Sequence, residues 1–532
     1  NNNILTSEKV DDYQLLIRII KYYMKNSKFL LLFILLICGN FLCKASSSTD
    51  FQVRGFHLDF RTQVMSVSAI KDLAHDLSQK GINTLIIEYE ASFPFKKHAT
   101  LSNKYAFTRS EIKEIVNYCS SIGIDVIPLQ NCFGHCEYIL RHDRYAKLRE
   151  NKKEISQVCP LEIEEAKKIF KEIFADMISL HTSKYLHIGA DETRLLGYCD
   201  KCSKVDKSKL FVDYVNAMCE VVKELGKTPI IWADIILKHP ESINDLPKDL
   251  VFEDWNYGWN PNHFGDLENL LNLGVKIWGA SAMRCSPDDI YITQWMKHFN
   301  NLSTFIPFAR LHGYEGILNT SWSTSGQYGF HYAPGWEILG MQPIREVYPM
   351  SGFNILIDAF IESINKDIPL DIHDFVITFG KNRYGFSEKE AAIFLDYFLI
   401  PQEKVSRGKA GKENIKDALE QCENMKSRIN CIHPIKNQSE FEHYKLMLDF
   451  RINYLEFKEV EKIYQSHNYD LSMANELYEK MNIIMKVFKD LNSRLIKLNK
   501  GYFKDDCCEN ICLGIQEKMQ DLYNSLKKQV LN

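Results

Sequence analysis

Between residues 51 and 345, short apolar runs alternate with stretches that carry apolar residues at helical spacing. The apolar runs predict strands over residues 53–59, 82–89, 125–130, 185–189, 229–233, 251–255, 275–280 and 316–321. The amphipathic stretches predict helices, among them residues 66–79, 109–121, 163–180 and 209–225. A strand followed by a helix, repeated eight times, is typical of a (β/α)8 TIM barrel. Residues 341–365 can supply its last helix, so we expect the barrel over residues 51–365.

An open, doubly wound α/β sheet is the competing fold for this alternation. That fold usually carries a glycine-rich phosphate loop after its first strand. The residues that end the first predicted strand and follow it are Asp59, Phe60, Arg61 and Thr62, which do not form such a loop. The sequence therefore favours the barrel.

The pattern changes after the barrel. From about Asp371 onward there is no strand pattern, and long amphipathic helices are predicted over residues 386–397, 412–429, 439–466 and 471–498. They predict an α-helical bundle over residues 366–532. A chain of 532 residues is also too long for one core, which favours two folded units. We expect the helices to pack within the chain, or to pair between two chains as a homodimer.

The first 45 residues have the pattern of a targeting segment. Residues 24–45 combine a basic start, an apolar core of about ten residues and a small-residue exit, which describes a secretory signal peptide. The core is shorter than the run of about 20 apolar residues that a transmembrane helix needs. Residues 1–23 are interpreted as upstream read-through or a disordered leader. We expect an exported protein (periplasmic, secreted or lumenal), with an uncleaved membrane anchor as the alternative.

Charge and cysteine content narrow the function classes. The formal net charge is −4, whereas nucleic-acid-binding proteins usually show a basic excess. Among 15 cysteines, Cys199 and Cys202 form a CxxC motif. A zinc site would need two further ligands at a suitable spacing, and none is obvious. We interpret the pair as local thiols or a local disulfide in preference to zinc, and expect no cofactor and no metal.

Side chains suited to catalysis gather at the predicted carboxyl ends of the strands, where TIM-barrel enzymes hold their active sites. The fourth strand ends in His-Ile-Gly-Ala-Asp-Glu, so Asp191 and Glu192 form a carboxylate pair suited to acid–base work on a glycosidic bond. Trp232, Trp255 and Trp322 stand at the ends of three later strands. Aromatic walls around a polar pocket fit a sugar ring, whose faces are apolar and whose hydroxyls need polar partners.

These residues resemble glycoside hydrolase family 20, the β-N-acetylhexosaminidases, and look closest to its hexosaminidase D-like branch. The motif at 187–192 matches the family's His-x-Gly-x-Asp-Glu signature. Further similar segments are the first strand at 55–61, the Phe-Gly-His turn at 133–135, and the Trp-bearing strand ends at 231–234, 254–255 and 320–322. The resemblance covers roughly residues 52–340. It implies removal of terminal, non-reducing GlcNAc or GalNAc from N-acetylhexosamine-containing glycans.

The resemblance also implies a role for each residue. Glu192 would be the general acid and then the base that activates water, and an acid at neutral pH needs a raised pKa. Asp191 would hold the substrate's 2-acetamido group, whose carbonyl oxygen would attack the anomeric carbon with overall retention. For His135 a purely structural, buried role is the alternative. The expected substrate-binding residues are Arg61, His135, Trp232, Trp255, Tyr257 and Trp322.

Departures from the family leave the substrate open. The family's Tyr-x-Asp at the seventh strand has no counterpart at residues 281–285, so Tyr257 is taken as the acetamide's hydroxyl partner. The family's Trp-x-Glu at the eighth strand reads Trp-Ser-Thr at 322–324, so the glutamate that would bind the far sugar hydroxyls is missing. The preference between the glucosamine and galactosamine configurations is therefore open.

The alternative functions are a specialised relative that releases a disaccharide or a sulfated hexosamine, and a non-catalytic glycan-binding barrel. An unrelated metal hydrolase is disfavoured, because His57, His135 and His187 lack a close ligand spacing.

Overall fold

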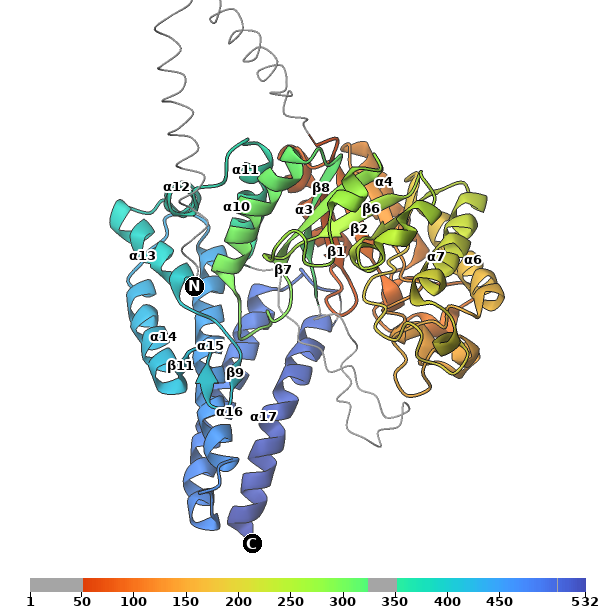
Figure 1. The fold of residues 1–532 in the computed structure, drawn as a ribbon. Helices are drawn as coiled ribbons and strands as arrows, with labels where there is room; N and C mark the ends of the chain where they lie inside the picture. The colour runs from red at the N-terminus through yellow and green to blue at the C-terminus, as the bar shows by residue number, and fades with distance from the viewer. Residues whose placement is uncertain (1–50, 324–351, 505) are drawn as a thin grey trace, which may run out of the picture. The chain divides into compact units, whose positions relative to one another are not determined.

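Eight parallel strands of the described chain close into a barrel in sequence order, with β1 paired to both β2 and β8 (Figure 1). The computed structural model describes residues 51–323, 352–504 and 506–532. The strands are β1 (Val53–Asp59), β2 (Thr84–Glu88), β3 (Asp125–Leu129), β4 (Tyr185–His187), β5 (Thr228–Trp232), β6 (Val251–Trp255), β7 (Lys276–Arg284) and β8 (Gly316–Ser321). The predicted TIM barrel is confirmed. Only β7 differs much from its predicted range, because it continues past residue 280 to Arg284.

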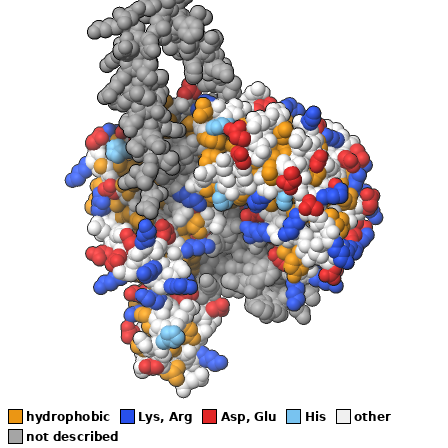
Figure 2. Space-filling view, in the orientation of Figure 1, with side chains coloured by type: hydrophobic (Ala, Val, Ile, Leu, Met, Phe, Trp, Pro, Cys, Tyr) orange, Lys and Arg blue, Asp and Glu red, His pale blue; other side chains and the backbone are white. Residues whose placement is uncertain are grey.

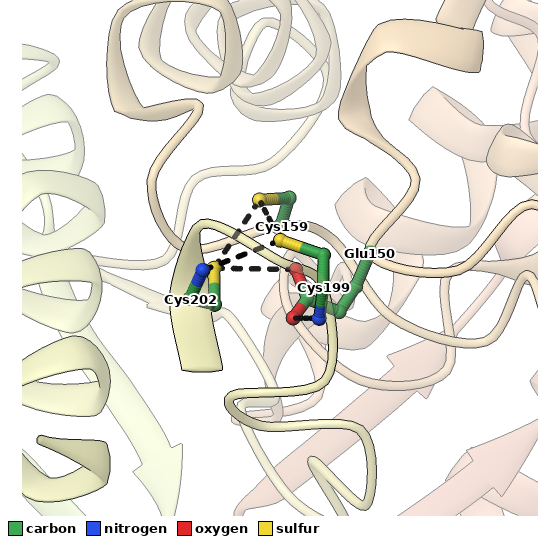
Figure 3. A group of neighbouring side chains, drawn as sticks. All are labelled: Glu150, Cys159, Cys199 and Cys202. Carbon is green, nitrogen blue, oxygen red and sulfur yellow. Dashed lines mark hydrogen bonds between the residues drawn. The ribbon is translucent and has the colours of Figure 1, made fainter. Parts of the chain in front are cut away.

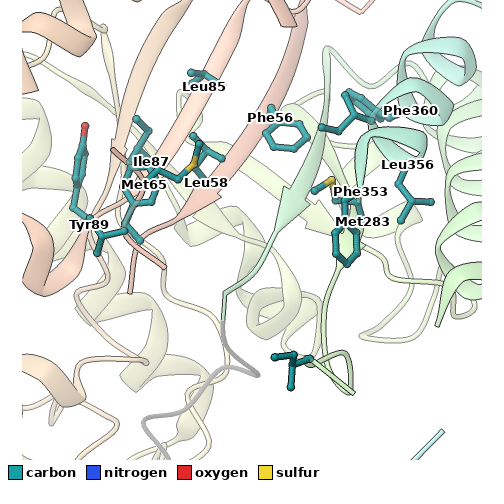
Figure 4. Packing of buried hydrophobic residues seen from close by; sticks show 14 of the residues in the cluster. Phe56, Leu58, Met65, Leu85, Ile87, Tyr89, Met283, Phe353, Leu356 and Phe360 are labelled. Carbon is teal, nitrogen blue, oxygen red and sulfur yellow. The ribbon is translucent and has the colours of Figure 1, made fainter. Parts of the chain in front are cut away.

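Alternation along the strands divides their side chains between the barrel interior and the layer under the helices. On β1, Phe56 and Leu58 belong to the large buried cluster that packs beneath the surrounding helices (Figure 4). The alternate residues His57 and Asp59 face inward, where His57 Nε2 lies 3.4 Å from a carboxylate oxygen of Glu88 on β2. Inward polar residues near the strand ends thus supply one part of the candidate site.

Helices cover the outside of the barrel. The capping box between Thr108 and Glu111 sets the start of α4, because each side chain bonds the other residue's backbone N–H. The last barrel helix, predicted within residues 341–365, is α11, while residues 341–351 lie outside the described residues. The long helices of this layer are α3 (Val67–Gln79), α4 (Arg109–Ser121), α6 (Ile163–Ile178), α7 (Lys207–Glu224), α10 (Trp295–Leu311) and α11 (Asn354–Ile364).

The C-terminal region is mainly helical, as predicted. Its helices are α12 (Ile372–Tyr384), α13 (Glu388–Leu399), α14 (Ile415–Ile429), α15 (Gln438–Tyr464), α16 (Ala474–Leu498) and α17 (Cys507–Leu531). The prediction of no strand after Asp371 is wrong, because three short antiparallel strands form there: β9 (Val405–Ser406), β10 (Lys409–Ala410) and β11 (Glu413–Asn414). Arg407 and Gly408, both at positive φ, form the tight turn between β9 and β10. Two-residue strands are too short to show an alternating pattern.

The barrel and the C-terminal helices share a core, and residues Phe51–Asn532 form one compact unit. The ring of Tyr291, just before α10, stacks on Tyr454 of α15 at 5.1 Å between centroids. Trp295 of α10 contacts Phe398 of α13 edge-on at 5.0 Å. The packing role expected of these helices is therefore present within the chain, and pairing between two chains stays a prediction.

The remaining predictions concern the N-terminal segment and the surface. The predicted leader and signal peptide, residues 1–45, lie outside the described residues. Among the described helices, none is long and apolar enough to cross a membrane. Acidic and basic side chains are interspersed on the face shown in Figure 2, in keeping with the small net charge.

Candidate active site

The loop after β4 carries the carboxylate pair on a constrained backbone. Gly189, Ala190 and Glu192 have left-handed φ angles of 72°, 73° and 46°. For residues other than glycine this conformation costs about 1–2 kcal/mol each, so neighbouring contacts must hold it. One contact comes from the signature histidine, because His187 Nδ1 accepts a hydrogen bond from the Gly189 N–H at 3.0 Å. The motif therefore fixes the directions of its two carboxylates.

Two glycines let the loops after β3 and β4 touch. A Cβ atom on Gly134 would lie 2.2 Å from the backbone oxygen of Asp191, and one on Gly189 would lie 2.0 Å from Asn131 Oδ1. Both distances are far inside van der Waals contact. Gly134 and Gly189 therefore both allow the two loops to approach closely. This close approach brings His135 beside the carboxylates.

His135 lies between the two acidic side chains. Its Nε2 is 3.2 Å from Asp191 Oδ2 and 3.4 Å from Glu192 Oε2. Burial disfavours the charged imidazole, but the neighbouring Asp191 and Glu192 together hold the pKa of His135 well above its ordinary value. His135 is therefore a buried cation in contact with both carboxylates, and its role in positioning Asp191 stays a prediction.

Glu192 has a second cationic partner. Arg194 Nη2 donates a hydrogen bond to Glu192 Oε1 at 2.7 Å. Burial acts to raise the pKa of Glu192, yet His135 and Arg194 together lower it to about 2. The raised pKa expected for this residue is therefore wrong for this arrangement, in which Glu192 is ionised. The two cations lower the pKa of Glu192 by more than burial raises it. Arg194 belongs to no sequence motif, so its effect on Glu192 was not predictable from the sequence.

Asp234, just after β5, fastens the loop from the other side. Its Oδ2 accepts a hydrogen bond from the Glu192 backbone N–H at 3.2 Å. Its Oδ1 is buried and has no hydrogen-bond partner among the described residues. Burial, followed by the charge of Asp191, raises the pKa of Asp234 to about 7. A carboxyl group that titrates near neutrality thus sits directly behind the pair.

Arg61 is held in place by acidic neighbours. Its Nε and Nη2 donate to the two oxygens of Asp59 at 3.0 and 2.8 Å. Its Nε also lies 3.6 Å from Glu88 Oε1, which accepts a further hydrogen bond from Asn131 Nδ2 at 2.8 Å. A bidentate pair of this kind fixes the plane of the guanidinium, so Arg61 presents pre-oriented donors.

A cavity of about 300 Å³ lies at this mouth of the barrel. The rings of Trp232 and Trp322 stand 5.8 Å apart, and those of Trp255 and Tyr257 stand 5.0 Å apart. Trp322 Nε1 donates a hydrogen bond to the Tyr257 hydroxyl at 2.9 Å. All eight residues predicted for the site line this cavity: Arg61, His135, Asp191, Glu192, Trp232, Trp255, Tyr257 and Trp322.

Several lining residues were absent from the predicted set. Glu88 and Asn131 stand at the ends of β2 and β3, and their place on the rim was a usable signal. Trp259 and the residues near it belong to the loop after β6, where no periodic pattern marks them. The additional lining residues are Glu88, Asn131, Trp259, His263, Phe264, Cys285 and Ser286.

The arrangement of a His-x-Gly-x-Asp-Glu loop at the mouth of a TIM barrel agrees with the comparison to known families. The sequence profile of the glycosyl hydrolase family 20 catalytic domain matches residues 51–328. The chain belongs to glycoside hydrolase family 20. The barrel is therefore its family 20 catalytic domain.

Named family members show how far the similarity extends. The chain is 28% identical to human hexosaminidase D over 308 residues, 53% of this chain and 62% of that protein. It is 31% identical to lacto-N-biosidase from Bifidobacterium bifidum over 268 residues, 45% of this chain and 23% of that protein. A chitobiase structure from Flavobacterium johnsoniae is 16% identical, covers 90% of this chain and 72% of its own, and gives a TM-score of 0.46.

The two departures from the family pattern have structural counterparts. At the end of β7, Arg284 is fully buried and donates to Ser321 and Gln63, so it is part of the wall and not a sugar ligand. After β8, the Ser323 backbone N–H donates to Asp59 Oδ2 at 2.8 Å and so supports the carboxylate that holds Arg61. Thr324, at the position of the family's glutamate, lies outside the described residues.

Proposed function

We propose that this chain is an exo-acting β-N-acetylhexosaminidase that removes terminal non-reducing GlcNAc or GalNAc with retention, through an oxazolinium intermediate. The observation that carries the proposal is the pairing of Asp191 and Glu192 at an aromatic cavity. Asp191 Oδ1 is buried without a hydrogen-bond partner among the described residues, so it is free to accept the acetamide N–H. Tyr257, across the cavity, is the donor to the acetamide oxygen.

In this proposal the substrate supplies its own nucleophile. The acetamide carbonyl oxygen attacks the anomeric carbon while Glu192 gives its proton to the departing glycosidic oxygen. Asp191 accepts the acetamide N–H and stabilises the positive charge that develops on the resulting oxazolinium. Glu192, now ionised, takes a proton from water, and that water opens the oxazolinium at the anomeric carbon. The acetamide attack inverts the configuration of the anomeric carbon, and the attack by water inverts it a second time, so the overall configuration is retained.

Glu192 must hold a proton when the glycan is bound, although its neighbours favour the ionised form. Arg194 is the partner that can leave, because its side chain is 58% exposed. We propose that the leaving sugar displaces Arg194, and that the drier environment then raises the pKa of Glu192. Arg61 binds ring hydroxyls, and Trp232, Trp255 and Trp322 enclose the ring and the acetamide methyl.

The test is hydrolysis of aryl β-N-acetylglucosaminide and aryl β-N-acetylgalactosaminide by the parent protein and by Glu192→Gln. We expect cleavage of at least one substrate and a loss of about 10³-fold in kcat for the variant, as for removal of a general acid. The ratio of the two parent rates gives the sugar preference. Activity undiminished in Glu192→Gln would refute the assignment of the acid.

The similarity to a protein named lacto-N-biosidase makes an aryl β-lacto-N-bioside the third substrate to assay. Cleavage of this disaccharide substrate, without cleavage of either monosaccharide substrate, would favour the specialised relative. Binding of amino-sugar glycans with no cleavage of any substrate would favour a glycan-binding barrel.

A further inference from the structure

Three cysteines and one glutamate converge beside the active-site loop. Cys199 and Cys202 follow β4, whereas Glu150 and Cys159 belong to the segment between β3 and α6. Figure 3 shows the three sulfur atoms turned toward one another, with the carboxylate of Glu150 beside them. One ligand-type atom from each of the four residues lies within 4.8 Å of all the others. The structure thus supplies the two further ligands that the CxxC motif lacked in the sequence.

Three of the six separations among these ligand atoms match those of a tetrahedral metal site. With Zn–S bonds of about 2.3 Å and a Zn–O bond of about 2.0 Å, a tetrahedron places two sulfurs about 3.8 Å apart and a sulfur and an oxygen about 3.5 Å apart. In the structure, Cys159 Sγ lies 3.9 Å from Cys199 Sγ and 3.5 Å from Cys202 Sγ. Cys202 Sγ lies 3.4 Å from Glu150 Oε2. All three separations agree with the tetrahedral values to within a few tenths of an ångström.

Burial and charge also favour a cation. Glu150, Cys159 and Cys202 are buried, and Cys199 is half-buried. Among the described residues, no lysine, arginine or histidine forms an ion pair with Glu150. A buried carboxylate usually has a cationic or metal partner. A divalent ion between Glu150 and the thiolates would supply it.

Backbone contacts around the cluster resemble the supporting shell of a metal site. The Cys199 N–H donates to Glu150 Oε1 at 2.8 Å, which orients the carboxylate so that Oε2 faces Cys202. The Cys202 N–H donates to Cys199 Sγ at 3.4 Å, a bond that stabilises a thiolate. The ligand set of three thiolates and one carboxylate is closed, which is typical of a structural ion and leaves no position for a substrate.

We propose that Glu150, Cys159, Cys199 and Cys202 bind one zinc ion, which fastens the β3–α6 segment to the loop that carries the catalytic pair. That loop reaches the same segment a few residues earlier, where the Leu195 N–H donates to Gln157 Oε1 at 2.8 Å. The ion would lie between the loops that follow β3 and β4 and would hold the loop of Asp191 and Glu192 in position. Zinc is favoured over harder ions because three of the four ligands are thiolates.

A disulfide is the competing use of these thiols. It would join two sulfurs at about 2.05 Å and would leave the third thiol and Glu150 without a partner. The three cysteines are free in the structure, and neither sulfur contact of Cys159 is at bonding distance. A disulfide therefore uses only part of the cluster, whereas a metal ion uses all of it.

The test is metal content by inductively coupled plasma mass spectrometry on the full-length protein, purified without added metal or chelator. We expect about one zinc per chain in the parent and its loss in Cys202→Ser. The matched control is Cys219→Ser, a buried cysteine outside the cluster, which should keep the zinc. Equal zinc content in the parent and Cys202→Ser, or a disulfide-linked peptide containing Cys159 and no zinc, would overturn the proposal.

A second variant guards against failure of Cys202→Ser to fold. Glu150→Gln keeps an oxygen for the Cys199 N–H but removes the anionic ligand. We expect it to transfer zinc to a colorimetric chelator at least about tenfold faster than the parent, since loss of a supporting or ligating group typically costs 10–100-fold in affinity. Cobalt added to the metal-depleted parent should give thiolate-to-metal absorption and tetrahedral visible bands, which should weaken in Glu150→Gln. Absence of these bands in the parent would contradict a thiolate site.

Discussion

At the scale of single residues, the cations around Glu192 decide how the site works. His135 is buried between both carboxylates, whereas Arg194 reaches only Glu192 from the solvent side. A buried histidine cation is costly to remove, because it would leave two neighbouring anions unpaired. The exposed arginine can be withdrawn at little cost. The two partners therefore have different tasks, one structural and one adjustable.

Arg194→Met tests this division. Removal of a cation beside Glu192 raises the pKa of Glu192, so the protonated acid persists to higher pH. The limb of the kcat/KM profile on which activity falls as the acid ionises should move to higher pH by up to about 0.7 unit, because an exposed ion pair contributes up to about 1 kcal/mol and one pKa unit is about 1.4 kcal/mol. Arg141→Met, at an exposed arginine away from the cavity, is the control. An unchanged profile in Arg194→Met would show that Arg194 does not set the pKa of Glu192.

At the scale of elements, the site depends on how closely two strand-end loops approach. The glycine of each loop faces a polar atom of the other at a distance that no Cβ atom can share. His187 Nδ1 and Asp234 Oδ2 then accept hydrogen bonds from the backbone N–H groups of Gly189 and Glu192 and hold the signature loop in place. The loop geometry is thus set by contacts among three strands, and not by the loop's own residues alone.

Comparison of Gly189→Ala with a matched control separates the effect of the close contact between Gly189 and Asn131 from the effect of backbone strain. Its matched control is Gly123→Ala, since Gly123 also has a positive φ, of 81°, but has open space where a Cβ would lie. Both variants should lose about 1–2 kcal/mol from the left-handed backbone. Only Gly189→Ala should also lose activity, by at least about 100-fold, because a shift of about 1 Å in catalytic groups can cost that much. Thermal unfolding and hydrolysis of the preferred aryl substrate measure the two effects, and equal activity in both variants would contradict the account.

Element periodicity, the signature motif and the family resemblance were sufficient to predict the barrel and eight of the residues that line its cavity, but not the loop after β6 that carries Trp259. The alternation of apolar runs and amphipathic stretches is local, so strands such as β1 and β6 have the predicted bounds. The pKa of Glu192 and the ligands of Cys199 and Cys202 were not predictable in this way. They depend on Arg194 and on residues about 40 to 50 positions away, which only the folded chain brings together.

At the scale of the whole molecule, the barrel and the helical region share a core. Besides the aromatic contacts of Tyr291 and Trp295, the C-terminal chain touches the loop after β1. Ser66 Oγ donates to the Gly501 oxygen at 2.7 Å, and the Lys504 N–H donates to the Val64 oxygen at 2.8 Å. That loop also carries Arg61, so the helical region supports the side of the barrel on which Arg61 lines the cavity.

Tyr454→Ala tests whether the two regions unfold together. Loss of a largely buried aromatic ring should destabilise the chain by about 3 kcal/mol. Because Tyr454 of α15 stacks on Tyr291 of the barrel, the midpoint for loss of activity should fall as far as the midpoint for loss of helical circular dichroism. Leu471→Ala, at a side chain 70% exposed, should change neither midpoint. A fall in the helical midpoint with the activity midpoint unchanged would show that the regions are independent.

The most direct test of the proposed catalysis changes the substrate and leaves the protein intact. Aryl β-glycosides of the preferred sugar can carry an N-acetyl, N-fluoroacetyl or N-trifluoroacetyl group, which makes the amide oxygen a progressively weaker nucleophile. If the acetamide attacks the anomeric carbon, kcat should fall steeply along this series, and the first-formed sugar should be the β-anomer by proton NMR. Rates that are insensitive to the acyl group, or a first-formed α-anomer, would contradict substrate assistance at Asp191 and Glu192.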